Sequence, residues 1–145
     1  MQIVQYLRRL YAYVIIDTNA WLSDAVLAAI DESDVIVLIV TQDIPSIKNA
    51  RLFLDLASTL GVQRERIALA MNRYDKRIGI TPEKVGENLK VKIAATIPLD
   101  EKTVIPSVNR GVPFILDAKT QAVSRGILTL AEAVRERISA FEIEV

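Results

Sequence analysis

The sequence predicts a three-layer α/β/α fold with a mainly parallel sheet, and three observations support this prediction. Short apolar runs rich in β-branched residues alternate with segments of helical period. The runs are almost continuously apolar, which is typical of parallel strands covered on both faces. The loops that join strands to helices are short, as right-handed β-α-β crossovers require. The predicted strands are residues 14–17, 35–40, 67–71 and 93–97.

Two helices are predicted in the first half of the chain. Residues 21–30 repeat apolar side chains on one helical face, which places Trp21 in the core rather than on a binding surface. Residues 45–60 show the same period and end at Gly61, because glycine commonly terminates helices. The candidate caps of this second helix are Asp43 and Ser46.

Three more helices are predicted in the second half. Thr81 and Pro82 mark a helix start, with Thr81 as the cap and Pro82 in the first turn. The next helix covers residues 102–109 and stops before Gly111. The last helix covers residues 121–141. Its buried side is expected to carry Leu128, Ala131, Val134 and Ile138.

Composition excludes several classes of function. The 18 basic and 18 acidic residues give zero net charge, so no basic surface for nucleic acid is expected. Cysteine and histidine are both absent, which excludes disulfides, thiolate nucleophiles and the usual general base. No apolar run approaches the ~20 residues that span a bilayer, and the N-terminus lacks the apolar centre of a secretion signal. We therefore expect residues 1–145 to form a single cytoplasmic domain without a transmembrane segment.

Asp17 is the first candidate site residue. It ends the first predicted strand, and nucleotide hydrolases hold Mg²⁺ or its water with a carboxylate at this place beside the phosphates. A cap on the next helix, or an Asx-turn, explains the same residue equally well. The loop that normally grips the phosphates, Gly-x-x-x-x-Gly-Lys-Ser/Thr, does not occur in the sequence.

Two other strand ends carry candidate base-binding residues, which would share one edge of a parallel sheet. Asn72 offers an amide donor and acceptor to a purine edge, and the Arg73 guanidinium can stack on a base. Asp75 could accept from guanine. Each residue also fits a structural role, such as satisfying turn backbone or, for Asp100, capping a helix. The fourth strand ends in Pro98, Leu99 and Asp100.

Taken in order, the motifs of the chain resemble the MinD/ParA class of P-loop ATPases. The motifs are YVIIDT at 13–18, DVIVLIVT at 34–41, MNR at 71–73, IPLD at 97–100 and NRGVP at 109–113. Within the class, three segments are most similar to the pilus-assembly CpaE/TadZ branch. These are DTNAWL at 17–22, IPSIKNAR at 44–51 and NRYD at 72–75. The resemblance covers about residues 7–138.

The resemblance implies roles for the candidate residues. Asp17 would take the Walker B position and act through water on Mg²⁺. Asn72 would contact adenine of ATP or ADP with Arg73 beside it. The residues that would close over the base are Pro98, Leu99 and Asp100. The family works as an ATP-sandwiched homodimer that positions pilus or Tad-type secretion machinery, often at a cell pole.

The chain departs from the family where the Walker A loop should be. In the family that loop lies upstream, and the strand that carries it runs between those predicted here at residues 14–17 and 35–40. An unfilled gap would leave backbone groups unpaired. Either the two strands close up, another chain fills the gap, or the chain belongs to a longer protein.

The sequence therefore predicts the C-terminal part of a CpaE/TadZ-like ATPase that does not hydrolyse ATP as this chain alone. The alternative is a non-catalytic α/β interaction module of a secretion or polarity system. A third reading is a receiver-like signalling domain phosphorylated on Asp17, but no acidic cluster accompanies Asp17 and Asp100 stands where receivers have lysine. Adenine and guanine both remain open, because the segment from Asn72 to Asp75 resembles the guanine-reading Asn-Lys-x-Asp pattern.

Overall fold

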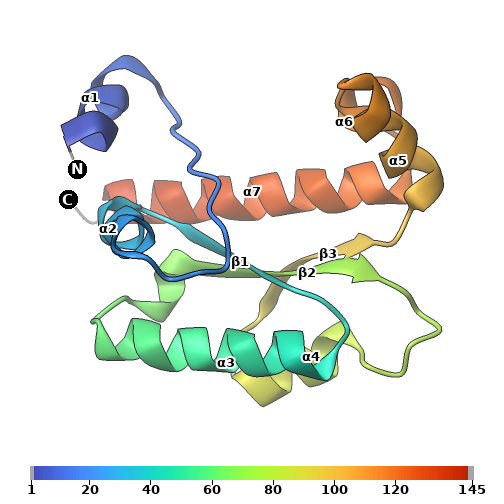
Figure 1. The fold of residues 1–145 in the computed structure, drawn as a ribbon, viewed down its shortest axis with the longest axis horizontal. Coiled ribbons are helices and arrows are strands. Elements are labelled where there is room, and N and C mark those ends of the chain that lie inside the picture. Colours follow the sequence, from blue (N-terminus) through green and yellow to red (C-terminus); the bar gives the residue numbers. More distant parts are fainter. Residues whose placement is uncertain (1, 144–145) are drawn as a thin grey trace.

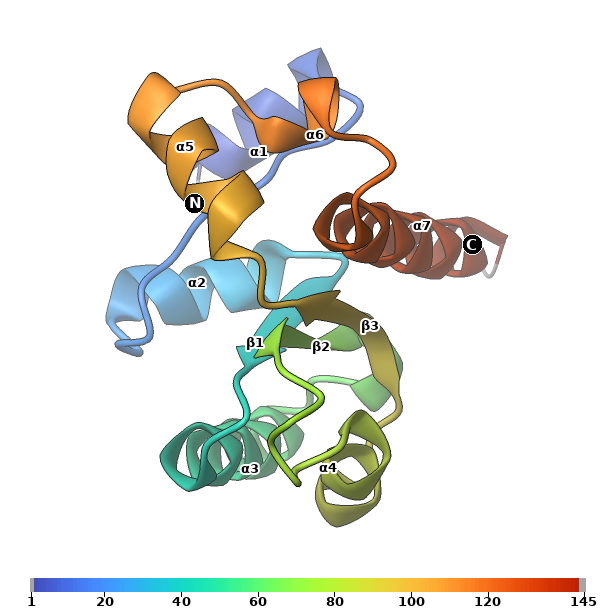
Figure 2. The ribbon, with the colours of Figure 1, turned by 90° about the vertical axis from the view of Figure 1, so that its right-hand side faces the viewer.

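The structure is a computed structural model that describes residues 2–143, and it has the predicted three layers (Figure 1). The sheet is parallel in the order β1-β2-β3. Helices α3 and α4 lie on one face, and α2 and α7 lie on the other (Figure 2). The strands are β1 (Ile36–Val40), β2 (Ile67–Tyr74) and β3 (Ile93–Pro98). The helices are α1 (Gln2–Leu10), α2 (Asp24–Glu32), α3 (Ile44–Thr59), the 3-10 turn η1 (Arg64–Arg66), α4 (Pro82–Leu89), α5 (Glu101–Arg110), α6 (Phe114–Asp117) and α7 (Ala122–Ile143).

The core lies between the sheet and the layer of α3 and α4. Strand β2 is central, and every residue from Ile67 to Met71 is buried, as its continuous apolar run predicts. Helix α3 buries one stripe against it, and Val85 and Leu89 of α4 complete the core. The buried residues of α3 are Ala50, Leu54 and Ala57.

Side-chain caps fix the starts of the helices that follow the strands. The Asp43 side chain caps α3 by accepting a hydrogen bond from the Ser46 amide at 2.8 Å. The Thr81 hydroxyl caps α4 by accepting a hydrogen bond from the Lys84 amide at 3.4 Å. Both starts were predicted from the sequence. Hydrogen bonds from Thr41 and from the Ser46 amide lower the pKa of the Asp43 carboxyl below its usual value.

Helix α7 packs closely on β3 because Gly126 has no side chain. A Cβ at Gly126 would lie 2.8 Å from the Thr96 carbonyl oxygen and 3.1 Å from Ile97 Cα. This contact centres the buried face of α7 on Gly126 rather than on the predicted stripe. Leu128 and Ala131 are therefore exposed, contrary to the prediction. The predicted residues that are half-buried are Val134 and Ile138.

The predicted strand at residues 14–17 is wrong. The chain is irregular between α1 and α2, and Ile15 in this stretch is 92% exposed. Within the described residues, β1 pairs only with β2, and the 14–17 segment pairs with no strand. An apolar run becomes a strand only when its backbone finds a partner. The first two predicted strands therefore do not close up on each other.

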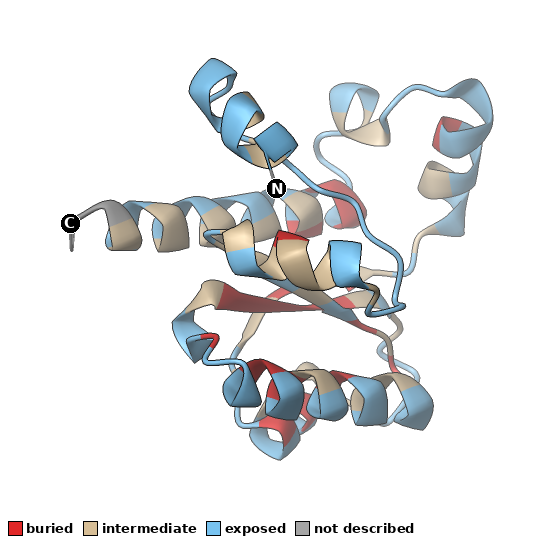
Figure 3. Ribbon diagram, turned by 60° about the vertical axis from the view of Figure 1, so that its left-hand side comes forward, coloured by how far each residue is buried: buried red, intermediate tan, exposed pale blue. Residues whose placement is uncertain are grey.

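A second prediction in this stretch, the burial of Trp21, is also wrong. Trp21 is 77% exposed rather than in the core, and α2 begins at Asp24 with Ser23 as its cap. Figure 3 shows α1 and the irregular segment exposed over most of their length. Helices α1 and α6 were not predicted. No helix within residues 2–143 is both long and apolar enough to cross a membrane.

Candidate functional site

The carboxyl end of β2 contains a β-bulge. Met71 pairs with Thr96 and Tyr74 pairs with Pro98, so β2 has one residue more than β3 between these pairs. Arg73, inside the bulge, has φ +54°, in the left-handed region. A side chain there costs about 1–2 kcal/mol relative to ordinary backbone. Asn72 Oδ1 accepts from the Arg73 amide at 2.9 Å and helps to hold this conformation.

The loop after β3 lies against this bulge. The Leu99 amide donates to the Tyr74 carbonyl at 2.9 Å, and the Leu99 side chain is 38% exposed. Arg73 Nη2 lies 3.5 Å from Oε1 of Glu101, the first residue of α5. The sequence-predicted residues at the ends of β2 and β3 are thus brought together at one edge of the sheet.

The Asp100 side chain caps α5. Its Oδ1 accepts from the Thr103 amide at 3.0 Å, and its Oδ2 accepts from the Thr103 hydroxyl at 2.7 Å. These hydrogen bonds lower the pKa of the Asp100 carboxyl below its usual value. The capping alternative is therefore confirmed for Asp100, whose two carboxylate oxygens each accept a hydrogen bond from Thr103.

Asp75 is held by Arg77 within the same loop. Arg77 Nε lies 2.9 Å from both carboxylate oxygens, and its Nη2 lies 2.5 Å from Oδ2. The side-chain and backbone hydrogen bonds from Arg77 lower the pKa of Asp75 to about 2. The carboxylate that could have accepted from guanine is thus already occupied.

Gln42 is a residue of this edge that the sequence did not identify. It is 8% exposed, and it lies just after β1, separated from it by Thr41. Its Nε2 donates to the Ile80 carbonyl at 2.6 Å, and its Oε1 accepts from the Asp75 amide at 2.5 Å. Gln42 therefore fixes the β2–α4 loop to the end of β1. A glutamine between polar loop residues gives no sequence signal for this role.

Asp17 does not lie in a metal site formed by the described residues. It is exposed in the irregular segment between α1 and α2. Across residues 2–143, no group of three or more acidic residues is arranged to hold a metal ion. Mg²⁺ takes oxygen ligands in near-octahedral geometry, and one exposed carboxylate supplies a single ligand. The residues present thus do not form a magnesium site by themselves.

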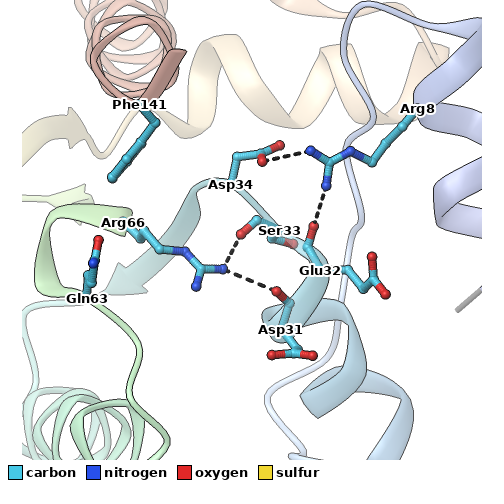
Figure 4. A pocket seen from close by; sticks show the side chains of 8 residues that line it. All are labelled: Arg8, Asp31, Glu32, Ser33, Asp34, Gln63, Arg66 and Phe141. Atoms are coloured by element: carbon cyan, nitrogen blue, oxygen red, sulfur yellow. Dashed lines mark hydrogen bonds and ion pairs between the residues drawn. The ribbon is translucent and has the colours of Figure 1, made fainter. Parts of the chain in front are cut away.

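A hollow of about 340 Å³ lies at the opposite edge, near the amino ends of β1 and β2 (Figure 4). Arg66 donates to the carbonyls of Ile30 (3.0 Å) and Ser33, which ends α2. Arg8 of α1 donates to the Glu32 carbonyl and pairs with Asp34, both at 2.9 Å. These cations stabilise the negative end of the α2 dipole. The hollow is accounted for by this anchoring of α1 and α2, and it contains no predicted site residue.

Comparisons with known proteins place the fold. No family model matches the chain. It is 25% identical over 130 residues to the septum site-determining protein MinD of Thermotoga maritima, covering 86% of this chain and 47% of the relative. It is 28% identical over 137 residues to a putative MinD of Emiliania huxleyi, covering 91% of this chain and 49% of the relative. The chain thus spans about half the length of the curated relatives it matches.

Solved structures of MinD and ParA family proteins have the same fold as this chain. The MinC:MinD cell division complex of Aquifex aeolicus superposes with a TM-score of 0.82 at 21% identity, covering 93% of this chain and 57% of that chain. MinD complexed with Mg-ADP from Pyrococcus horikoshii gives 0.77 at 21% identity, covering 92% and 54%. A ParA family ATPase of Chlorobium tepidum gives 0.79 at 21% identity, covering 90% and 54%. Sequence and fold together support homology between this chain and the MinD/ParA-class P-loop ATPases.

Proposed function

We propose that the chain is the C-terminal part of a CpaE/TadZ-like ATPase and supplies the base side of an adenine nucleotide site. One observation carries the proposal: the bulged end of β2, with Asn72 and Arg73, lies against the end of β3 at Pro98 and the loop residue Leu99. Ligands of parallel α/β sheets bind beyond this edge. The match to about half of each MinD relative supports the assignment to one part of the domain.

The proposed contacts follow from the groups that remain free. The Asn72 amide nitrogen donates to a purine ring nitrogen, because its Oδ1 is already bound to the Arg73 amide. The Arg73 guanidinium stacks on the base. Pro98 and Leu99 present apolar surface, and the backbone of Asp100 closes the loop.

The occupied carboxylate of Asp75 favours adenine over guanine. Guanine presents N–H donors at N1 and N2, and a site that selects it needs a free acceptor. Both oxygens of Asp75 already accept from Arg77. Reading guanine would require Asp75 to share its oxygens between Arg77 and the base, whereas adenine requires no acceptor at this position.

The edge of β1 that pairs with no strand of residues 2–143 supports the proposal of a larger domain around this chain. Val37 and Ile39 are 40% and 47% exposed on the sheet face opposite α3. Ile15 and Trp21 are also exposed nearby in sequence. Parallel sheets bury both faces and pair their inner strands on both sides. A preceding segment that adds a strand beside β1 would satisfy the edge and cover these side chains.

We further propose that the chain does not hydrolyse ATP on its own. Backbone amides and a lysine of the phosphate loop supply most of the phosphate binding in such ATPases, and the sequence lacks that loop. Asp17 would join a Mg²⁺ site only beside residues from that loop. Partners in a pilus or secretion apparatus, a homodimer, and a cytoplasmic, polar location follow from the CpaE/TadZ resemblance.

An NMR titration with ADP tests the proposal. We expect the amide resonances of Asn72, Arg73, Leu99 and Asp100 to shift at millimolar ADP. Asn72→Ala should weaken the response, while Asn88→Ala, an exposed asparagine on α4, should leave it unchanged. No shifts at these amides, or an equal response in Asn72→Ala, would contradict the nucleotide site.

The second candidate is a non-catalytic interaction module. It is favoured by exposed apolar side chains on α5 and α6, where Val108 is 71% and Leu116 is 61% exposed. The same titration separates the two functions. The module alone predicts no change at the strand ends at any nucleotide concentration.

A further inference from the structure

We propose that Glu101 is a positioning residue that fixes the Arg73 guanidinium as one wall of the base site. The inference rests on the proposed function and adds a residue that neither the sequence motifs nor the resemblance includes. Its starting point is the ion pair between Arg73 Nη2 and Glu101 Oε1 at 3.5 Å.

The backbone of Arg73 gives the first argument. Its φ of +54° is a conformation that glycine adopts without cost and that arginine adopts with strain. Such strain persists where the surroundings impose it, and it gathers at functional sites. The bulge fixes the direction in which the Arg73 side chain leaves β2.

The ion pair gives the second argument. Arg73 belongs to β2 and Glu101 to the first turn of α5, so the pair links the two segments that lie on either side of the Leu99 loop. The side chains are 65% and 60% exposed, and such pairs contribute little to stability. The pair favours the Arg73 rotamers that bring the guanidinium toward the start of α5. Restricting those rotamers before binding reduces the entropy lost when a base stacks on the guanidinium.

The neighbouring helix start gives the third argument. Asp100 is fixed as the cap of α5 by two hydrogen bonds to Thr103, so Glu101 is held on a rigid helical turn rather than on a loop. A positioning residue requires such a support. Glu101 is thus able to orient Arg73 without touching the base.

Adenosine is the probe that tests this role, because it has no phosphate charge that a change at Glu101 would attract or repel. We expect Glu101→Gln to weaken adenosine binding about threefold, the size of one weak ion pair. Glu83→Gln is the matched control, since it removes a carboxylate that is also exposed and also lies in the first turn of a helix, α4. The Arg73 Nε–H resonance should move upfield when adenosine stacks, and this shift should shrink in Glu101→Gln.

Two substitutions to glycine distinguish an effect on adenosine binding from an effect on folding. Arg73→Gly should weaken adenosine binding at least fivefold without lowering the urea midpoint of unfolding, because glycine relieves the left-handed backbone. Lys90→Gly is the control, since Lys90 caps α4 at φ +55° and lies away from the site. It should preserve both binding and the midpoint.

Each outcome is decisive. Adenosine binding by the unmodified chain with equal affinity in Glu101→Gln and Glu83→Gln would overturn the positioning role alone. Tighter binding in Glu101→Gln would also overturn it, because Glu101 would then compete with the base for Arg73. Absence of adenosine binding by the unmodified chain would overturn the proposed nucleotide site together with this role.

Discussion

The backbone amide of Asp75 donates to Oε1 of Gln42 at 2.5 Å, which joins the loop after β2 to the end of β1. The other end of the same side chain donates to the Ile80 carbonyl. One buried amide thus satisfies two backbone groups of a loop that has no regular secondary structure of its own. The shape of the sheet edge beside Asn72 depends on this contact.

Gln42→Ala is expected to destabilise the fold by about 1–3 kcal/mol, because it leaves the part-buried Asp75 N–H and Ile80 C=O without partners. Urea unfolding measures the change. Gln121→Ala, at an exposed position before α7, is the control and should stay within about 0.5 kcal/mol of the unmodified chain. Equal stability of Gln42→Ala and the control would show that the loop does not depend on Gln42.

Gly126→Ala is expected to destabilise the fold by about 1–3 kcal/mol through overpacking. Its Cβ would meet backbone atoms of β3, which cannot move as a flexible side chain would. Gly79→Ala is the matched control, because nothing lies within 4 Å of a Cβ there. Thermal unfolding of both variants measures the effect, and a Gly126→Ala variant as stable as Gly79→Ala would refute the close packing of α7 on β3.

The Asp75–Arg77 pair predicts a pH dependence of stability. The native pKa of Asp75, about 2, lies below its value in the unfolded chain, about 4. The ionised carboxylate therefore stabilises the fold fully above about pH 4, and this stabilisation is lost as the pH falls toward 2. Asp75→Asn should have a lower urea midpoint than the unmodified chain at pH 7, and the difference should shrink between pH 4 and pH 2.

Arg77→Ala is the control for that experiment, since it removes the cause of the shift and leaves the carboxylate in place. The double variant should be no less stable than the less stable single variant, as coupled residues are not additive. A midpoint difference that persists unchanged down to pH 2, or fully additive losses, would contradict the pair.

The open edge of β1 predicts self-association of the isolated chain at high concentration, because unpaired strand edges with apolar side chains recruit other chains. Ile39→Lys should reduce the apparent mass measured by light scattering toward that of a monomer. Ile105→Lys places the same charge at a similarly exposed isoleucine on α5 and should have a smaller effect. An equal effect of the two would indicate general solubility rather than the strand edge.

The parts of the fold that pack within the chain were predictable from the sequence. Strands β1, β2 and β3 follow their apolar runs, and the caps Asp43, Thr81 and Asp100 begin the helices where the sequence places them. Each of these features depends on contacts between residues that the chain itself supplies. At these positions the local sequence pattern and the contacts within the folded chain therefore favour the same structure.

The wrong predictions concern residues whose structure depends on contacts that the local sequence pattern does not show. Residues 14–17 have the same apolar pattern as β1 but no strand beside them, and a single sequence does not reveal a missing partner. Trp21 is exposed because α2 starts at Asp24, three residues after the start that the apolar pattern suggests. The left-handed Arg73 was not predictable either, because that conformation favours glycine or asparagine and is imposed here by the bulge.

The central claim, that this chain recognises a purine but lacks the anchor for its phosphates, is tested most directly by comparing adenosine with ATP plus Mg²⁺. Isothermal titration or NMR on the same sample gives both affinities. We predict millimolar binding of both ligands, with affinities within about threefold and no gain from Mg²⁺, because the sequence lacks the loop that grips the triphosphate in such ATPases. Micromolar ATP binding that exceeds adenosine binding a hundredfold and requires Mg²⁺, or no binding of either ligand, would contradict it.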